Sequence, residues 1–319
     1  MTTAPQTCAM PYRRLGRTGL NVSVIGYGGS PLGDVFGPTD PSERKRAVHL
    51  AIENGINFFD VSPYYGQTLA EERLGEALVG KRNQIILATK CGRYGVDQFD
   101  FSAKRVFASV EESLQRLKTD YIDLYQAHDV EFGDLNQVIE ETVPAMRKLQ
   151  EQGKVRFIGV TGYYPKALKK IAKAVPVDTI LSYCRYNLLV NDMDIELTPF
   201  AKENEIGLIN ASALHMGILT EGGPPSWHPA PPAIKDMGRK LATLCRARGF
   251  NISAVALRHC VDHPYVCSTL VGMSEANQVM RNLEILRIKN DPELLSELRQ
   301  MIAPVFNHIW PSGRAENRG

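Results

Sequence analysis

The sequence predicts an α/β fold, a (β/α)8 TIM barrel with an N-terminal β-hairpin and a long loop after strand seven. Short apolar runs alternate with amphipathic helices along the chain, and eight such repeats specify a closed parallel barrel. The composition of the 319 residues, 44% hydrophobic and 23% charged, is ordinary for one large core. We therefore expect a single domain over residues 1–319.

The N-terminal part is expected to form a hairpin that covers the barrel floor. The segment YRRLGRTGLNVSV turns at residues 17–19, where Gly19 can supply a positive φ. The first barrel strand is predicted over residues 22–28. The glycine-rich stretch GGSPLGDVFG after it does not match the GxGxxG spacing of a nucleotide-binding turn. We therefore predict a plain flexible loop there.

A helix and the second strand follow. The helix is predicted over residues 41–54, with Ser42 as its cap and Gly55 as its end. The second strand, INFFD, is an apolar run that stops at the carboxylate of Asp60. Strands covered on both faces read as continuous apolar runs, so a charge at the end of one needs a partner or a function.

The rest of the chain repeats this alternation. Further strands are predicted at residues 84–90, 120–128, 155–162, 178–183, 205–212 and 268–273. Amphipathic helices separate them, at residues 69–80, 102–118, 135–153, 164–174 and 192–204, with two more around 241–263. Ser102 is a suitable cap for the helix it begins, and Pro144 is expected to kink the helix that contains it.

Residues 217–233, GILTEGGPPSWHPAPPA, interrupt the alternation after strand seven. With five prolines the segment is predicted to be neither strand nor helix, and a long loop at a barrel mouth is often a substrate lid. Trp227 in it is either a packing anchor or a platform for a sugar ring, and both interpretations stay open. His259 and His263 have the spacing of an HExxH zinc site but lack its glutamate, so no metal site is predicted.

Four polar side chains at successive strand ends form the candidate catalytic set. Asp60 and Tyr65 follow the second strand, Lys90 ends the third, and His128 ends the fourth. Each residue type alone is more often structural. In a parallel barrel, however, side chains at the carboxyl ends of different strands converge on one mouth, so the joint pattern favours a functional set.

These residue types suit acid/base catalysis together. A tyrosine pKa near about 10 is too high for a proton shuttle at neutral pH, and an adjacent ammonium stabilises the phenolate. We expect Lys90 to lower the pKa of Tyr65 in this way and Asp60 to keep Lys90 charged and in place. His128 would orient a carbonyl or hydroxyl beside the phenol.

This order of residues on successive strand ends resembles the aldo-keto reductase superfamily, over essentially the whole chain. Within it, the chain is most similar to the L-galactose 1-dehydrogenases, in GGSPLGDVFG, INFFDVSPYYG, ATKCGRY, FDFSAKRV, HDVEFG, LSYCRYN, GPPSWHPA, LVGMS and WPSG. The resemblance implies a NAD-dependent aldose 1-dehydrogenase. It would oxidise the C1 hydroxyl of L-galactose, or of a close aldose such as L-fucose, to the aldonolactone, with Tyr65 as general acid/base. Two alternatives remain: a reductase of other aldehydes or pyridoxal, and a non-enzymatic cofactor-binding subunit of potassium channels.

The resemblance also implies that NAD binds across the barrel mouth. The implied cofactor-binding residues are Thr161, Gly162, Tyr183, Ser212, Leu214, Gly217, Gly272, Met273, Ser274, Gln278 and Asn282. In the related family, a Ser-Asn pair and a Gln hold the carboxamide of the nicotinamide. This chain has Thr161–Gly162 in place of the pair and Tyr183 in place of the Gln. Ala211 replaces an aromatic that stacks on the ring, and either Tyr183 or Tyr186 is expected to compensate.

NAD rather than NADP is expected from the segment VGMSEANQVMRN. NADP-preferring relatives place a lysine just before the serine and an arginine a few residues later, because a dianionic 2′-phosphate needs cations. This chain has Met273 and Gln278 at those positions, and Glu275 between them would repel a phosphate. The expected substrate contacts are Tyr64, Asp129, Trp227 and His228.

Composition argues against several other classes of function. Lys+Arg number 37 against 35 Asp+Glu, a net charge of +2 without a long basic run, which does not suit nucleic-acid binding. The N-terminus lacks a signal-peptide pattern and no stretch approaches the ~18 apolar residues of a membrane span, so we expect a cytoplasmic protein. The cysteines, which are expected to be reduced, are Cys8, Cys91, Cys184, Cys245, Cys260 and Cys267. The expected partner is a small-molecule sugar, and the oligomeric state stays open.

Overall fold

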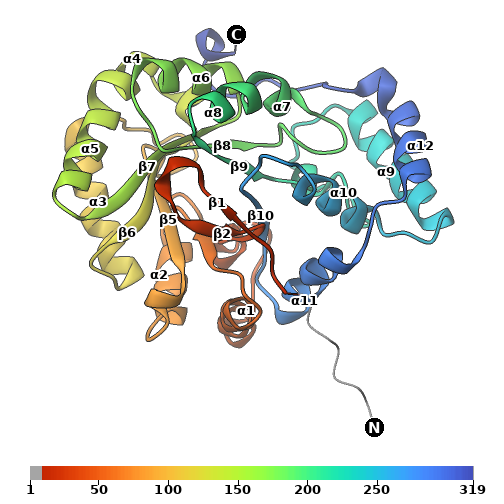
Figure 1. Cartoon of the computed structure of the whole chain (residues 1–319), viewed down its shortest axis with the longest axis horizontal. Helices are drawn as coiled ribbons and strands as arrows, with labels where there is room; N and C mark the ends of the chain where they lie inside the picture. Colours follow the sequence, from red (N-terminus) through yellow and green to blue (C-terminus); the bar gives the residue numbers. More distant parts are fainter. Residues whose placement is uncertain (1–8, 319) are drawn as a thin grey trace.

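The computed structural model describes residues 9–318, and Cys8 lies outside that range. Eight parallel strands close into a barrel with helices around the outside, which confirms the predicted fold (Figure 1). The strands follow one another around the barrel in chain order, and the last closes the ring by pairing with the first. They are β3 (Ile25–Gly28), β4 (Phe58–Asp60), β5 (Ile86–Cys91), β6 (Ile122–Ala127), β7 (Val155–Gly162), β8 (Thr179–Tyr183), β9 (Gly207–Ala211) and β10 (Ser268–Gly272).

The predicted N-terminal hairpin is present and covers the barrel floor. β1 (Tyr12–Arg14) pairs antiparallel with β2 (Asn21–Ser23), and Gly19 between them has a φ of 74°. Leu15 in the turn is fully buried among the side chains that fill the lower barrel. The first barrel strand starts later than predicted because Val22 belongs to the hairpin.

Helices surround the barrel and pack on the outside of the strands through apolar side chains, at the predicted places and also after β10, where no helix is predicted from the sequence. The α-helices are α1 (Pro41–Glu53), α2 (Leu69–Ala77), α3 (Ala103–Leu117), α4 (Leu135–Gln137), α5 (Val143–Glu151), α6 (Pro165–Ala174), α7 (Asp192–Glu196), α8 (Thr198–Glu203), α9 (Pro232–Ala247), α10 (Ile252–Val261), α11 (Ala276–Glu284) and α12 (Pro292–Ile302). Short 3₁₀ segments are η1 (Gly16–Thr18), η2 (Ser30–Gly33), η3 (Arg82–Gln84), η4 (Val130–Phe132), η6 (His215–Gly217), η7 (Ile285–Arg287), η8 (Ala303–Val305) and η9 (Ala315–Asn317). No helix within residues 9–318 is both long and apolar enough for a membrane span.

Two helix starts test the predicted caps. Ser102 caps α3 as predicted, because its hydroxyl accepts the backbone N–H of Arg105. At α1 the predicted cap Ser42 is wrong. The carboxylate of Asp40 caps this helix instead, by accepting the N–H groups of Ser42 and Glu43. A carboxylate also interacts favourably with the positive end of the helix dipole, which a serine hydroxyl cannot do as strongly.

The helix predicted over residues 135–153 is interrupted before Pro144. A π-helical turn, η5 (Val138–Thr142), separates α4 from α5 and ends two residues before the proline. Proline lacks the N–H that an α-helix needs, and its ring collides with the carbonyl four residues earlier. The wider π-turn accommodates the ring, so the predicted kink takes this form.

The long loop after β9 and the C-terminal segment both lie at the barrel mouth. The loop ends slightly earlier than predicted, because α9 begins at Pro232, where a missing N–H costs nothing. The C-terminal segment passes over the mouth after α12. There the backbone N–H of Asn307 donates to the carbonyl of Leu189, and that of Arg314 donates to the carbonyl of Glu131.

Candidate active site

The carboxyl ends of the barrel strands surround a cavity of about 1330 Å³. Small-molecule sites usually measure roughly 300–1,000 Å³, so this one has room for more than a single small ligand. Its walls combine strand ends with parts of residues 28–39 and 211–229. The glycine-rich stretch predicted as a plain loop therefore forms one wall. A Cβ on its Gly33 would lie 2.6 Å from the carbonyl oxygen of Tyr65, so the absent side chain lets the two segments pack.

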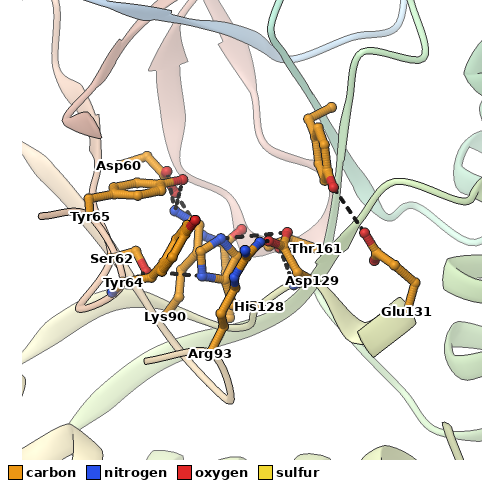
Figure 2. A network of polar contacts seen from close by, with 12 residues as sticks. Asp60, Ser62, Tyr64, Tyr65, Lys90, Arg93, His128, Asp129, Glu131 and Thr161 are labelled. Carbon is orange, nitrogen blue, oxygen red and sulfur yellow. Dashed lines mark hydrogen bonds and ion pairs between the residues drawn. The ribbon is translucent and has the colours of Figure 1, made fainter. Parts of the chain in front are cut away.

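The structure brings the four predicted catalytic residues together at this mouth (Figure 2). The ammonium of Lys90 donates to the carboxylate of Asp60, to the carbonyl of Val61 at 2.9 Å, and to the hydroxyl of Tyr65 at 3.5 Å. Lys90 is only 1% exposed. Asp60 is held in turn by Gln126, whose amide donates to the second carboxylate oxygen at 2.8 Å. The buried charges of Lys90 and Asp60 thus satisfy each other beside the phenol.

Burial dominates the electrostatics of Tyr65. It raises the pKa of the phenol to about 12, and the charge of Lys90 opposes this rise without cancelling it. The nearby carboxylates of Asp60 and Asp129 add to the rise in pKa. The expectation of a net lowered pKa for Tyr65 is therefore wrong. The direction of the Lys90 effect is as predicted, but desolvation of the phenolate outweighs it.

His128 is a buried, neutral imidazole at neutral pH. Burial, helped by the positive charges of Lys90 and Arg93, holds its pKa well below the usual value. Its Nδ1 lies 3.0 Å from the hydroxyl of Ser62, which also accepts the backbone N–H of Tyr64. The single hydroxyl proton of Ser62 is then free to be donated to Nδ1. That arrangement leaves the proton of the imidazole on Nε2.

An ion pair lies beside His128 on the same wall. The guanidinium of Arg93 donates to the carboxylate of Asp129 at 2.5 Å and lies 3.8 Å from the centre of the Tyr64 ring. Asp129 has a φ of 50°, and its N–H donates to the hydroxyl of Thr161 at 3.2 Å. A non-glycine residue in this left-handed region is strained, and such strain concentrates at functional sites.

Most of the predicted cofactor-binding residues line the cavity. They are Thr161, Tyr183, Ser212, Leu214, Gly217, Gly272, Ser274 and Gln278. Gly162, Met273 and Asn282 do not line it. Met273 is fully buried in the core, so its side chain does not face a ligand. Of the two tyrosines expected to replace the missing aromatic ring, only Tyr183 lines the cavity. The Tyr186 ring stacks on His259 instead.

The predicted substrate contacts divide in the same way. Tyr64, Asp129 and Trp227 line the cavity. Trp227 is 55% exposed, and its ring lies 6.3 Å from that of Phe36, so these two aromatics flank the cavity from the two mouth loops. His228 does not line the cavity. It is buried, and its Nε2 lies 3.1 Å from the carbonyl of His215.

Sequence reasoning missed four polar residues that support the site: Ser62, Arg93, Gln126 and Glu131. Gln126 carried a usable signal, because a residue two positions before His128 on a strand points to the same side. Ser62 has the same relation to Asp60. Arg93 lies in a loop and Glu131 in the short segment η4, both beyond the strand ends, where no periodicity indicates direction.

The two histidines with zinc-like spacing have other contacts. His263 Nε2 lies 2.9 Å from a carboxylate oxygen of Asp194, and His259 stacks on Tyr186. Among the residues that the structure describes, no group of three or more His, Cys, Asp or Glu side chains could hold a metal ion. Cys91 beside Lys90 is fully buried, and burial raises the pKa of its thiol to about 12.

The chain is similar to known oxidoreductases. The model of the aldo/keto reductase family matches residues 24–303. The chain is 46% identical to the L-galactose dehydrogenase of Arabidopsis thaliana over 316 residues, which cover 96% of this chain and 98% of that protein. It is 29% identical to a D-threo-aldose 1-dehydrogenase of a Pseudomonas species over 311 residues, 88% of this chain and 94% of that protein. Among solved structures, the holo form of an aldo-keto reductase from Bacillus halodurans matches with a TM-score of 0.78 at 28% identity, covering 97% of this chain and 100% of that one. The chain therefore belongs to the aldo/keto reductase family of oxidoreductases.

Proposed function

We propose that the protein oxidises the C1 hydroxyl of L-galactose, or of a closely related aldose such as L-fucose, to the aldonolactone with NAD. The observation that carries the proposal is the buried contact of Lys90 with both Asp60 and Tyr65, next to His128 on the wall of a large cavity. The similarity to an L-galactose dehydrogenase across nearly the full length supports the choice of sugar.

The cavity fits a nicotinamide dinucleotide. Ser212, His215 and Met216 have φ values of 59°, 50° and 50°, so the segment after β9 curls into a tight concave loop at the cavity wall. The N–H groups of His215 and Gly217 donate to carbonyls of the same loop, so an anion such as a pyrophosphate would bind to the remaining N–H groups of the loop. Ser274 and Gln278, which follow the neighbouring strand β10, would hold the adenosine end. A bound nicotinamide supplies the hydride acceptor of the reaction.

Tyr65 is the proposed proton acceptor. Its phenolate takes the proton of the anomeric hydroxyl while the C1–H bond breaks with loss of a hydride, and the C1–O bond becomes the lactone carbonyl. Lys90 stabilises the phenolate at 3.5 Å. The Nε2–H of His128 donates to the reacting oxygen and so keeps it beside the phenol. Because these groups act through their fixed positions, Asp60 contributes by holding Lys90 in place, and Gln126 by holding Asp60.

Asp129, Arg93 and Tyr64 are proposed to orient the sugar. The carboxylate of Asp129 can accept hydrogen bonds from hydroxyl groups of the sugar. Arg93 holds that carboxylate through an ion pair, and its guanidinium lies over the Tyr64 ring. Trp227 offers an exposed indole face on which a sugar ring can stack. These groups lie on the same cavity as Tyr65, so they can select a sugar by its ring hydroxyls.

The surroundings of α11 favour NAD over NADP. The backbone N–H of Ser274 donates to the side-chain oxygen of Gln278 at 2.8 Å, and that of Ala276 donates to the carboxylate of Glu43 at 3.4 Å. Glu275 lines the cavity beside them. The charge of Glu43 is partly balanced by Arg46, 3.1 Å away. A 2′-phosphate at this end would therefore meet the carboxylate of Glu275 and amides that already have partners. A ribose hydroxyl, which can donate to a carboxylate, meets no such penalty.

A panel of aldoses assayed with NAD and with NADP tests the proposal. We expect the highest kcat/KM with L-galactose or L-fucose and NAD, together with lactone formed in equal amount to NADH. Simple aldehydes with NADPH serve as the matched comparison for the alternative reductase activity. Faster turnover of aldehydes with NADPH than of any aldose with NAD would overturn the proposal.

A further inference from the structure

A buried carboxyl group that the reaction does not use lies next to the site. Glu131 is 0% exposed and follows β6, and it lies on the opposite side from Tyr65 in Figure 2. Its Oε1 accepts the hydroxyl of Tyr183 at 3.0 Å, while its Oε2 has no hydrogen-bond partner among residues 9–318. Burying a carboxyl group is costly unless it is hydrogen-bonded or loses its charge. Burial and the charge of Asp129 raise its pKa to about 8, so it is mainly protonated at neutral pH.

Tyr183 connects this carboxyl group to the cavity. It ends β8, where it pairs with Ala211 at the end of β9, and both residues line the cavity. Ala211 presents only a methyl group, so the ring of Tyr183 is the aromatic surface at this point of the wall. β8, which ends at Tyr183, lies between β7, which carries Thr161, and β9, which leads into the loop that begins at Ser212.

Gly162 makes room for Glu131. A Cβ on this glycine would lie 2.5 Å from Glu131 Oε2, closer than any real contact allows. Gly162 has no positive φ, so the absence of a side chain here reflects space rather than backbone conformation. The glycine at the end of β7, the tyrosine at the end of β8 and the carboxyl group after β6 thus form one arrangement.

The C-terminal segment fixes the main chain of Glu131. Its carbonyl accepts the backbone N–H of Arg314 at 2.9 Å and the side-chain amide of Asn317 at 2.9 Å. A Cβ on Gly313 would lie 2.4 Å from the same carbonyl, so the segment packs directly against it. Glu131 is therefore held from both its main chain and its side chain.

We propose that Glu131 is a positioning residue of the cofactor site, which holds the hydroxyl of Tyr183 so that the Tyr183 ring packs against the nicotinamide ring beside Ala211. This inference rests on the nicotinamide-dependent function proposed above. A dinucleotide whose pyrophosphate lies on the loop from Ser212 must pass this wall to reach Tyr65 and His128. Flat aromatic rings stack favourably, and a ring that is fixed in advance loses less freedom when the cofactor binds.

The dissociation constant of NADH, measured by fluorescence titration of the folded protein, tests this role. Tyr183→Ala is expected to weaken NADH binding by roughly tenfold or more, because the stacking surface is lost. Glu131→Leu should weaken binding by a comparable factor, because the buried hydroxyl of Tyr183 loses its acceptor. Glu131→Gln, which keeps an acceptor of the same size, should restore affinity to within about threefold of the parent. Gly162→Ala should resemble Glu131→Leu, because its Cβ displaces the carboxyl group.

A double-mutant cycle distinguishes positioning from an independent structural role. If Glu131 acts through the hydroxyl, Glu131→Leu combined with Tyr183→Phe should bind NADH as Tyr183→Phe alone does. The matched control is Tyr186→Phe, a tyrosine outside the cavity, which should leave binding unchanged. Thermal melting of each variant establishes that it is folded at the titration temperature.

Additive effects in the cycle, or an unchanged NADH affinity of Tyr183→Ala, would overturn the inference about Glu131. The proposed function would still stand if the parent protein oxidises aldoses. A parent protein that binds neither NADH nor NADPH in the same titration would overturn the proposed function together with the inference. The two failures are therefore distinguishable from the parent measurement alone.

Discussion

Replacing Lys90 by methionine should slow sugar oxidation by about three orders of magnitude. Methionine keeps most of the length of the side chain but removes the only ammonium that contacts Tyr65 in the part of the chain that the structure describes. The substitution also leaves the carboxylate of Asp60 next to the phenol with Gln126 as its remaining side-chain partner. Both changes disfavour the phenolate, because Asp60 raises the pKa of Tyr65 and Lys90 lowers it.

The magnitude follows from the distance. Two unit charges 3.5 Å apart, at an effective dielectric constant of about 20, interact by about 4.7 kcal/mol, which corresponds to about 3.5 pKa units. With a phenol pKa of about 12 in the parent, the phenolate fraction at pH 7 is already only about 10⁻⁵. Loss of Lys90 should lower that fraction by a further factor of about 10³, within the usual range for general acid/base groups.

The assay is kcat for oxidation of L-galactose with NAD from pH 6 to pH 10. In the parent the rate should rise with pH, by up to about tenfold per pH unit, because the free-chain pKa of Tyr65 lies above this range. Lys166→Met, which removes an exposed lysine from α6, is the matched control and should behave as the parent. Breaking a buried ion pair costs roughly 3–5 kcal/mol of stability, so melting curves must accompany the rates. A folded Lys90→Met variant with kcat within a few-fold of the parent at pH 8 would refute the reasoning.

Three further predictions follow from the same geometry. Glu43→Gln combined with Gln278→Arg should raise kcat/KM for NADP by at least about tenfold, because a repulsive charge is removed and a charge-assisted contact is added. An unchanged ratio of kcat/KM with NAD to kcat/KM with NADP would contradict the proposed role of residues around α11. Ser62→Ala should lower kcat about tenfold with little change in NADH affinity, because His128 loses the partner that fixes its tautomer; equal kcat values would show that Ser62 has no such role. Trp227→Ala should raise KM for the sugar several-fold without lowering the melting temperature, because the indole is 55% exposed; a large loss of stability would instead mark it as a packing anchor.

The fold and the four candidate catalytic residues could be predicted because both depend on local pattern. Continuous apolar runs mark buried parallel strands, and a charge at the end of each run marks the mouth. Asp60, Lys90 and His128 satisfy this rule directly, so their proximity follows from topology alone. The helix start at α1 was missed because Asp40 and Ser42 are both good caps, and only the backbone geometry selects between them.

The electrostatics and the loop residues could not be predicted in the same way. The sign of the Lys90 effect on Tyr65 is evident from charge, but the net pKa depends on how completely the phenol is buried, which a sequence does not report. The contact between Glu131 and Tyr183 joins a loop to a strand two positions further around the barrel. Nothing in the residue spacing indicates this contact. The reason for a glycine at position 162 is evident only when the position of the Glu131 carboxyl group is known.

The central claim is that Tyr65 exchanges the proton during aldose oxidation, and Tyr65→Phe tests it most directly. The phenyl ring keeps the shape of the site and removes only the hydroxyl that Lys90 contacts. Steady-state kcat for L-galactose with NAD and the dissociation constant of NADH should be measured on the same preparation, with Tyr186→Phe as the control. The account predicts a kcat lower by about 10²–10⁴-fold and an NADH affinity within about threefold of the parent. A Tyr65→Phe variant that oxidises L-galactose within a few-fold of the parent rate would contradict it.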